Sequence, residues 1–303
     1  MQMSDLMYRP GLLTGERILI TGGGTGLGKV MAEACLVLGA RVYIVGRRGG
    51  VLQQAADELN AAHADASGGY VSGLPCDIRA AEAISETLDQ VWADGGALTG
   101  LVNNAAGNFI SRTEDLSPRG FDAISNIVFR GTFYMTLDCG KRWIAEGRKA
   151  SVVSILTTWV WNGSPFTVPS AMSKAGVNAM TQSLAVEWGG KGIRFNAIAP
   201  GPFPTEGMSA RLNPGQEGAA YSDMRANPLG RVGRMEELAN LAVYLLAPGS
   251  EYVNGQTIAI DGAAYQATGG NFAGLRAWGD EQWTRVRDLI KATNEKDRAQ
   301  RTA

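Results

Sequence analysis

A glycine-rich turn follows directly on the apolar run of residues 18–20, and an apolar helical pattern begins after the turn. Gly22, Gly26 and Gly28 would let the backbone turn tightly and approach a pyrophosphate, whose charge the N-terminal amides of the helix would meet. In this strand–turn–helix context, the spacing predicts a dinucleotide-binding loop rather than a simple tight turn. The cofactor-binding residues expected in this loop are Gly22, Thr25, Gly26, Leu27 and Gly28.

The residues at the end of the second apolar run indicate which nicotinamide cofactor the chain binds, NAD(H) or NADP(H). An acid at this point would bind the ribose hydroxyls of NAD, but the sequence reads Val-Gly-Arg-Arg and no acid occurs before Asp57. The guanidinium of Arg47 can pair with a 2′-phosphate through two hydrogen bonds, whereas a carboxylate would repel that phosphate. We therefore expect NADP(H) as the cofactor, bound through Arg47, and we expect Arg48 to be solvated.

Ser170 and Lys174 lie four residues apart in a segment with helical spacing. Residues at this separation share one face of a helix, so both side chains are expected in the same site. The lysine would hold the ribose hydroxyls and raise the local positive potential. Serine is too short and too weakly acidic to replace a phenol as proton donor, and no tyrosine occurs between Ser151 and Gly218.

Short apolar, β-branched runs alternate with longer segments of helical spacing along most of the chain. This alternation is typical of βαβ units and predicts an α/β fold, a doubly wound parallel sheet of Rossmann type, as a single domain over residues 1–303. The strand candidates are residues 17–20, 41–45, 71–76, 101–103, 151–155, 194–198 and 257–260. The helix candidates are residues 29–38, 51–60, 80–92, 121–144, 171–188 and 236–246.

Two segments depart from the alternation. Residues 201–233 are rich in Pro, Gly, Asn and polar side chains, and a loop of this length is expected to be a substrate lid, with Tyr221 as a substrate contact. Tyr221 and Tyr134 are the nearest remaining phenols; either is a candidate for a displaced donor, and the alternative for Tyr134 is ordinary packing. Residues 266–303 form a C-terminal extension with a helical pattern from 283 to 290. The extension either covers a neighbouring groove or is a solvated appendage.

The composition points to a small-molecule substrate. The 303 residues carry a formal net charge of −1 without a dense Lys/Arg run, which argues against nucleic acid or an anionic membrane surface as partner. The three cysteines are scattered and the one histidine is His63, so we expect reduced core thiols and no metal site or Ser-His-Asp triad. With no membrane-spanning run and no leader pattern, the prediction is a cytoplasmic protein.

As a set, the motifs resemble those of the short-chain dehydrogenase/reductase family over residues 13–265. The spacing Thr-Gly-x-x-x-Gly-x-Gly is shared, and so are landmarks after later strands: Cys76-Asp77-Ile78, Asn103-Asn104-Ala105-Ala106-Gly107, Pro200-Gly201-Pro202 and Asp261-Gly262. The resemblance implies that Asp77 faces the adenine and that Asn103 lines the cofactor cleft. It also implies cofactor contacts from Ala105, Lys174, Pro200, Gly201 and Thr205.

The sequence resembles one branch of this family more closely than the family as a whole. The run from Asn103 to Ile110, followed by Leu-Ser-Pro, and the Val-Pro-Ser that ends at Ser170 closely resemble the 2,4-dienoyl-CoA reductases. These enzymes reduce conjugated dienoyl-CoA thioesters with NADPH, and they also carry serine four residues before the lysine. The resemblance implies an acyl-CoA substrate contacted by Asn108 and Phe109, and a homotetramer joined through the helices around Arg130 and after Lys174.

The chain departs from its relatives at two positions. In mitochondrial-type members a tyrosine after the fifth strand and an asparagine in the preceding helix donate hydrogen bonds to the thioester oxygen, but Trp159 and Arg130 stand here. An indole N–H can donate a hydrogen bond without releasing a proton, Arg130 can supply charge, and Thr157 or Thr158 is a further donor. The alternatives are that Trp159 is an aromatic wall and that Arg130 bonds helix or loop carbonyls.

The sequence therefore predicts an NADPH-dependent short-chain reductase acting on an unsaturated acyl-CoA. The expected catalytic residues are Lys174, Ser170, Trp159, Arg130 and Thr157. Two other interpretations stay open: a reductase or dehydrogenase of a different carbonyl or alcohol, and a nucleotide-binding protein that has lost catalysis. The fold does not separate them, because function belongs to the site.

Overall fold

The computed structural model describes residues 1–205, 227–268 and 273–301. These residues form a seven-stranded parallel sheet in the order β3-β2-β1-β4-β5-β6-β7. The strands are β1 (Arg17–Thr21), β2 (Arg41–Gly46), β3 (Tyr70–Pro75), β4 (Gly100–Asn103), β5 (Ala150–Ile155), β6 (Ile193–Pro200) and β7 (Thr257–Ile260). Tyr221 and most of the predicted lid lie outside the described residues.

The strand order reverses at the centre of the sheet. β1 pairs with β2 on one side and with β4 on the other, and all three strands are parallel. In a doubly wound sheet, the crevice for a ligand opens beyond the carboxyl ends of the two strands at such a reversal. The loops that follow β1 and β4 therefore define the place of the site.

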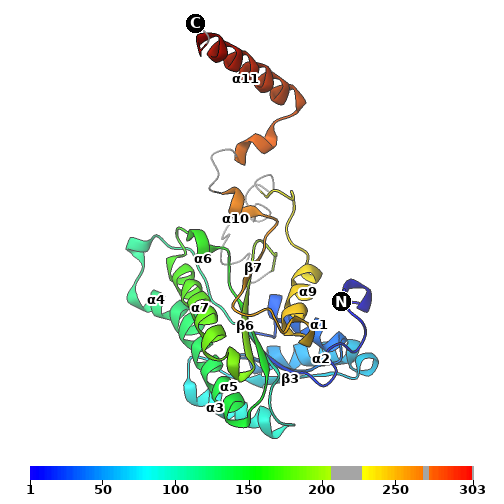
Figure 1. The fold of residues 1–303 in the computed structure, drawn as a ribbon. Coiled ribbons are helices and arrows are strands. Elements are labelled where there is room, and N and C mark those ends of the chain that lie inside the picture. Colours follow the sequence, from blue (N-terminus) through cyan, green and yellow to red (C-terminus); the bar gives the residue numbers. More distant parts are fainter. Residues whose placement is uncertain (206–226, 269–272, 302–303) are drawn as a thin grey trace.

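Helices cover both faces of the sheet (Figure 1). On one face lie α1 (Gly26–Val37), α2 (Gly49–Ser67) and α9 (Met235–Leu246), whose apolar side chains share one core cluster with β1 and β2. On the other face lie α3 (Ala81–Ala93), α5 (Thr132–Glu146) and α7 (Val168–Glu187), packed on a second cluster that contains the fully buried Trp143. Both faces of the sheet are thus buried, as a parallel sheet requires.

All seven predicted strands are confirmed, and the predicted helix over residues 121–144 is helical throughout, with a π-helical turn inside it. It consists of α4 (Pro118–Ser125), a π-helical turn η3 (Asn126–Gly131) and α5. At the end of this turn a Cβ on Gly131 would lie 2.8 Å from Cγ1 of Ile78, so the backbone here packs directly on the loop after β3. Such π-turns inside helices often occur at functional sites.

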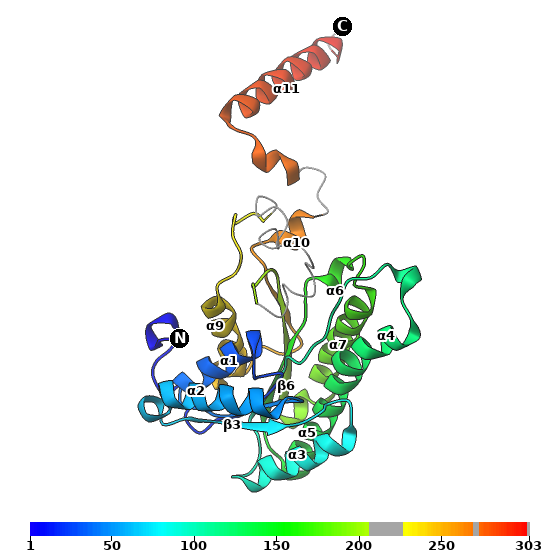
Figure 2. The ribbon, with the colours of Figure 1, turned by 180° about the vertical axis from the view of Figure 1, so that it is seen from behind.

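The chain after β7 continues through the short helix α10 (Ala264–Ala267) to α11 (Asp280–Arg301). In two opposite views, α10 lies at the carboxyl end of the sheet beside the short helix α6 (Trp159–Asn162), while α11 extends away from the sheet (Figures 1 and 2). The predicted helical pattern at residues 283–290 is therefore part of a longer helix.

Candidate cofactor and substrate site

The loop after β1 is tied to the loop after β4. Oγ1 of Thr21 accepts hydrogen bonds from the backbone N–H groups of Asn104 and Ala105, each at 3.0 Å. The Asn104 side chain in turn donates to the carbonyl oxygens of Thr21 at 2.9 Å and Gly22 at 3.2 Å. Two predicted motifs that are far apart in the sequence therefore form one structure at the reversal point of the sheet.

The glycines of this loop are required by its backbone conformation and by its close packing. Gly22 and Gly26 have φ of +66° and +55°, where glycine is favoured. A Cβ on Gly28 would lie 2.4 Å from the carbonyl oxygen of Gly22 and 2.6 Å from Nδ2 of Asn104. The side chain of Thr25, which precedes α1, makes no capping hydrogen bond, so the first amides of α1 are left for an anion.

Other predicted cofactor residues surround the same loop. A Cβ on Gly26 would lie 3.6 Å from Cγ2 of Thr205, so the start of the predicted lid segment reaches the loop. Leu27 is half-buried and packs on the core. After Pro200 ends β6, the Gly201 N–H donates to the Ile260 carbonyl at 3.0 Å, which joins the ends of β6 and β7.

Two arginines and one aspartate occupy the carboxyl ends of β2 and β3. Arg47 and Arg48 are both exposed directly after β2. Arg79 donates from Nε to Oδ1 of Asp77 at 2.9 Å and from Nη2 to Oδ2 at 2.5 Å. These hydrogen bonds lower the pKa of Asp77 below its usual value of 3.8, and the charge of Arg47 contributes in the same direction.

Arg79 was missed by the sequence reasoning, although it stands only two residues after Asp77. The neighbouring Asp-Ile-Arg triplet was the available signal, because a short acid–x–base spacing allows a fork-shaped ion pair. With Asp77 neutralised by Arg79, Arg47 gives this corner a net positive charge. The corner therefore suits an anionic group such as a ribose phosphate.

Lys174 and Ser170 lie on the buried side of α7. Lys174 is 7% exposed, and its Nζ donates a hydrogen bond to the carbonyl oxygen of Ile155 at the end of β5. Burial lowers the pKa of Lys174 to about 8. Ser170 is also buried, one turn before Lys174, so the shared face expected from the sequence is present.

Asn103 carries a buried acceptor without a partner. Its Nδ2 donates to Oγ1 of Thr136 on α5 at 2.9 Å, whereas its Oδ1 has no hydrogen-bond partner among the described residues. A buried polar atom of this kind is costly unless a ligand or water satisfies it. Together with the tight glycine turn after β1, this atom makes the crevice fit a bound dinucleotide.

Trp159 and Thr157 lie at the start of α6, directly after β5. The Trp159 backbone N–H donates to Oγ1 of Thr157 at 2.9 Å, which leaves the Thr157 hydroxyl hydrogen free to be donated elsewhere. The Trp159 side chain is half-buried, and no described residue accepts a hydrogen bond from its indole N–H. This segment therefore offers two donors without a titrating acid.

Arg130 is exposed at the end of η3 and paired with Tyr134 one turn later. Its Nε donates to the Tyr134 hydroxyl oxygen at 3.0 Å, and its guanidinium carbon lies 5.1 Å from the centre of that ring. Asn108 and Phe109 follow Gly107 in the loop after β4, and both are half-buried. The Asn108 side chain accepts a hydrogen bond from the Phe109 N–H at 2.9 Å.

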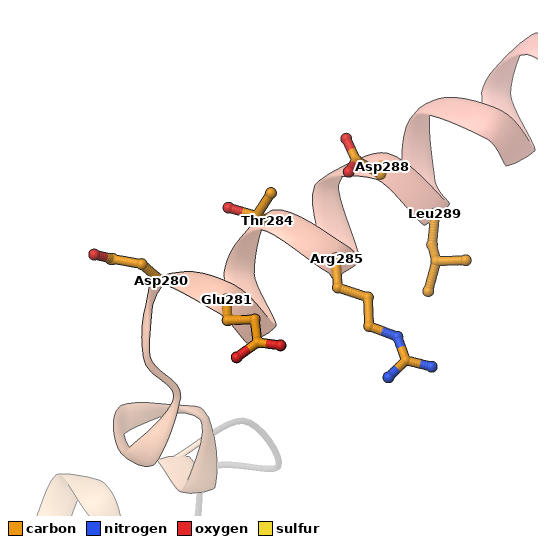
Figure 3. Close-up of a pocket in the computed structure, with 6 residues that line it drawn as sticks. All are labelled: Asp280, Glu281, Thr284, Arg285, Asp288 and Leu289. Carbon is orange, nitrogen blue, oxygen red and sulfur yellow. The ribbon is translucent and has the colours of Figure 1, made fainter.

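A hollow elsewhere on the molecule is unrelated to this crevice. Figure 3 shows it on α11, lined by Asp280, Glu281, Thr284, Arg285, Asp288 and Leu289. All of these residues belong to one helix, which cannot enclose a ligand by itself. Across the part of the chain that the structure describes, no three His, Cys, Asp or Glu side chains are grouped to hold a metal.

None of the helices formed by the described residues is both long and apolar enough to span a bilayer. The three cysteines are buried and free, as expected for core thiols.

Comparison with known proteins defines the class of this chain. The family model described as Enoyl-(Acyl carrier protein) reductase matches residues 22–263. An "Uncharacterized oxidoreductase" of Caenorhabditis elegans is 43% identical over 293 residues, which cover 95% of this chain and 92% of that protein. The "Probable 2,4-dienoyl-CoA reductase 3" of the same organism is 41% identical over 296 residues, 96% of this chain and 94% of that protein.

A solved structure agrees with these relatives. The crystal structure of a short-chain dehydrogenase from Bacillus anthracis has 39% sequence identity and a TM-score of 0.75, and the match covers 84% of this chain and 98% of that one. The chain therefore belongs to the short-chain dehydrogenase/reductase family and is an oxidoreductase of that family. Among its relatives, it resembles proteins named as 2,4-dienoyl-CoA reductases.

Proposed function

We propose that this protein is an NADPH-dependent reductase of unsaturated acyl-CoA thioesters, of the 2,4-dienoyl-CoA reductase type. The observation that carries the proposal is the buried Ser170–Lys174 pair next to a segment that presents Trp159 where a phenol would be expected. Such a site can bind and orient a conjugated thioester, but it offers no tyrosine to protonate an alkoxide. The names of the relatives favour the same substrate class.

The proposed chemistry divides the work between the cofactor and the chain. NADPH, when bound, supplies a hydride to a carbon of the conjugated system. Trp159 and Thr157 would donate hydrogen bonds to the thioester oxygen, where negative charge collects, and preorganised donors of this kind lower a barrier by several kcal/mol. Lys174 would hold the ribose hydroxyls and add positive potential, and water would protonate carbon.

Preference for NADP(H) over NAD(H) is proposed from the corner formed by Arg47, Asp77 and Arg79. Because Arg79 already neutralises Asp77, the carboxylate does not repel a 2′-phosphate. Arg47 is exposed beside it and free to form a bidentate pair with the phosphate. Gly22, Gly28 and the first amides of α1 would take the pyrophosphate.

The function is tested by NADPH oxidation with a panel of dienoyl-CoA, enoyl-CoA and simple carbonyl substrates. We expect oxidation with dienoyl-CoA and transfer of deuterium from only one of the two stereospecifically labelled forms of NADPH. Oxidation only with a simple carbonyl would assign the protein to another reductase activity. NADPH binding without oxidation by any substrate would indicate a nucleotide-binding protein without catalysis.

We also propose a homotetramer joined through η3, α5 and α7. Large apolar side chains are exposed on these elements: Phe129 is 47%, Phe133 41% and Val186 86% exposed. Exposed apolar surface of this kind commonly marks a protein interface. The cytoplasmic location stays a prediction.

A further inference from the structure

The helix that carries Trp159, α6, is too short to be stable without contacts to the rest of the protein. α6 comprises only residues Trp159–Asn162 and ends at Gly163, whose φ is +68°. A single helical turn is not stable in isolation, because few hydrogen bonds offset the cost of ordering it. Tertiary contacts must therefore determine where α6 lies and how it is rotated.

One side of α6 rests on the main body of the protein. Val160 packs against the buried cluster that contains Leu156 and Val177, which anchors the turn to β5 and α7. This contact does not by itself fix the rotation of the turn about its axis. A second contact on another side is needed for that.

The second contact is an aromatic stack with Tyr265 of α10, directly before the C-terminal extension. The rings of Trp161 and Tyr265 have centroids 4.6 Å apart and an interplanar angle of 21°. Trp161 is 42% exposed, so the core does not hold its ring independently of Tyr265. The same neighbourhood of α6 and α10 is visible from both sides of the molecule (Figures 1 and 2).

Tyr265 is itself held by a rigid turn after β7. The carboxylate of Asp261, which is 7% exposed, accepts hydrogen bonds from the N–H groups of Ala263 at 3.0 Å and Tyr265 at 2.8 Å. Ala263 itself adopts φ of +65°. This conformation is unfavourable for a residue with a side chain, and the turn imposes it. The backbone of Tyr265 is thus tied to the end of β7, at the edge of the sheet.

We propose that Trp161 and Tyr265 are positioning residues whose stack sets the orientation of α6 and hence of Trp159. Successive residues of a helix are rotated by about 100°, so Trp159 and Trp161 project to nearly opposite sides of the turn. Holding Trp161 against Tyr265 fixes the direction of Trp159. The catalytic part of this inference rests on the proposed function, whereas the effect on the order of α6 does not.

The order of α6 is measured by hydrogen exchange on the full chain without ligands. In Trp161→Ala and Tyr265→Ala, peptides covering residues 156–163 are expected to exchange about twofold to tenfold faster, the range expected for loss of one aromatic pair. Trp161→Phe and Tyr265→Phe keep a ring and should exchange like the wild type. The double alanine variant should match either single one, because both remove the same contact.

Tyr252→Ala is the matched control, because Tyr252 is fully exposed at 105%. It should leave exchange in residues 156–163 unchanged. Unchanged exchange in both Trp161→Ala and Tyr265→Ala would overturn the proposal, whatever their activities.

Kinetics tests the catalytic part with 2,4-hexadienoyl-CoA and NADPH. The alanine variants should lose about threefold to tenfold in kcat/KM for the thioester while KM for NADPH stays within twofold, and the phenylalanine variants should retain activity. Faster exchange with unchanged kinetics would overturn the positioning of Trp159. If none of the dienoyl-CoA substrates supports NADPH oxidation by the wild type, the proposed function is wrong. Hydrogen exchange alone then decides whether the stack orders α6.

Discussion

The buried ammonium of Lys174 makes the stability of the cofactor-free protein depend on pH. Its ordinary pKa of 10.5 falls to about 8 in the folded state, because burial penalises the charged form. Below pH 8 both states are protonated, and the folded state bears the full penalty. Between pH 8 and 10.5 the folded state binds fewer protons than the unfolded state, so the free energy of unfolding rises with pH.

Lys174→Met should therefore be more stable than the wild type at pH 7, by on the order of 1–3 kcal/mol. This advantage should shrink as pH rises from 8 to 10, as measured by urea unfolding followed by circular dichroism. Lys191→Met is the control, since Lys191 is exposed and should show no such trend. A difference between Lys174→Met and wild type that is constant with pH would contradict the assigned burial penalty.

Arg47 should select the phosphorylated cofactor. Arg47→Ala is expected to raise KM for NADPH by about tenfold or more, the size of one charge-assisted hydrogen-bond pair, and to change KM for NADH little. Arg48→Ala, at a neighbour that is also exposed, should have a much smaller effect. Equal effects of Arg47→Ala on the two cofactors would contradict a role in binding the 2′-phosphate.

Trp159→Phe keeps most of the aromatic bulk and removes the indole N–H. If that group donates to the thioester oxygen, kcat should fall by about tenfold or more, and the pH profile of the wild type should lack a limb from a titrating phenol at this position. Near-normal activity of Trp159→Phe would assign the side chain to packing. A higher kcat with dienoyl-CoA in the Trp159→Tyr, Arg130→Asn double variant than in the wild type would indicate that the substrate binds in the same geometry as in the relatives.

The turn between β1 and α1 depends on the absence of a side chain more than on any single contact. A Cβ on Gly28 would lie 2.4 Å from the Gly22 carbonyl oxygen, so Gly28→Ala must displace the start of α1. We expect a loss of NADPH affinity of more than about tenfold and destabilisation of about 1–3 kcal/mol, measured by fluorescence titration and thermal unfolding. Gly50→Ala is the control, because nothing lies within 4 Å of its added Cβ. Normal affinity in Gly28→Ala would argue against phosphate binding at this loop.

The protein should be an oligomer in solution if the exposed apolar side chains on η3, α5 and α7 form an interface between subunits. A charge at Val186, which is 86% exposed, would be tolerated in a monomer but not in a tetramer contact. Val186→Glu combined with Phe133→Glu should reduce the mass measured by light scattering from four chains to fewer. Tyr252→Glu should leave it unchanged, and a monomeric wild type would contradict the proposed assembly.

Local chemistry explains which features were predictable. The strands, the phosphate loop and Arg47 follow from short-range patterns, because strand periodicity, glycine spacing and the charge at a strand end are properties of neighbouring residues. The shared face of Ser170 and Lys174 is of the same kind, since helix geometry relates residues one turn apart. The strands, the glycine turn between β1 and α1 and the shared face of Ser170 and Lys174 are present in the structure as expected, whereas phosphate binding at the turn and the role of Arg47 stay predictions.

Other features depend on residues brought together from distant parts of the chain. The unpartnered oxygen of Asn103 exists because Thr136 on another element occupies only its amide nitrogen. The π-turn before α5 ends where Gly131 meets Ile78, and the rotation of α6 depends on Trp161 meeting Tyr265. No periodicity encodes such pairings, because they follow from how the packed elements lie in space. Local pattern thus specifies the sheet and the glycine-rich turn after β1, whereas packing between elements decides how Asn103, η3 and α6 are arranged.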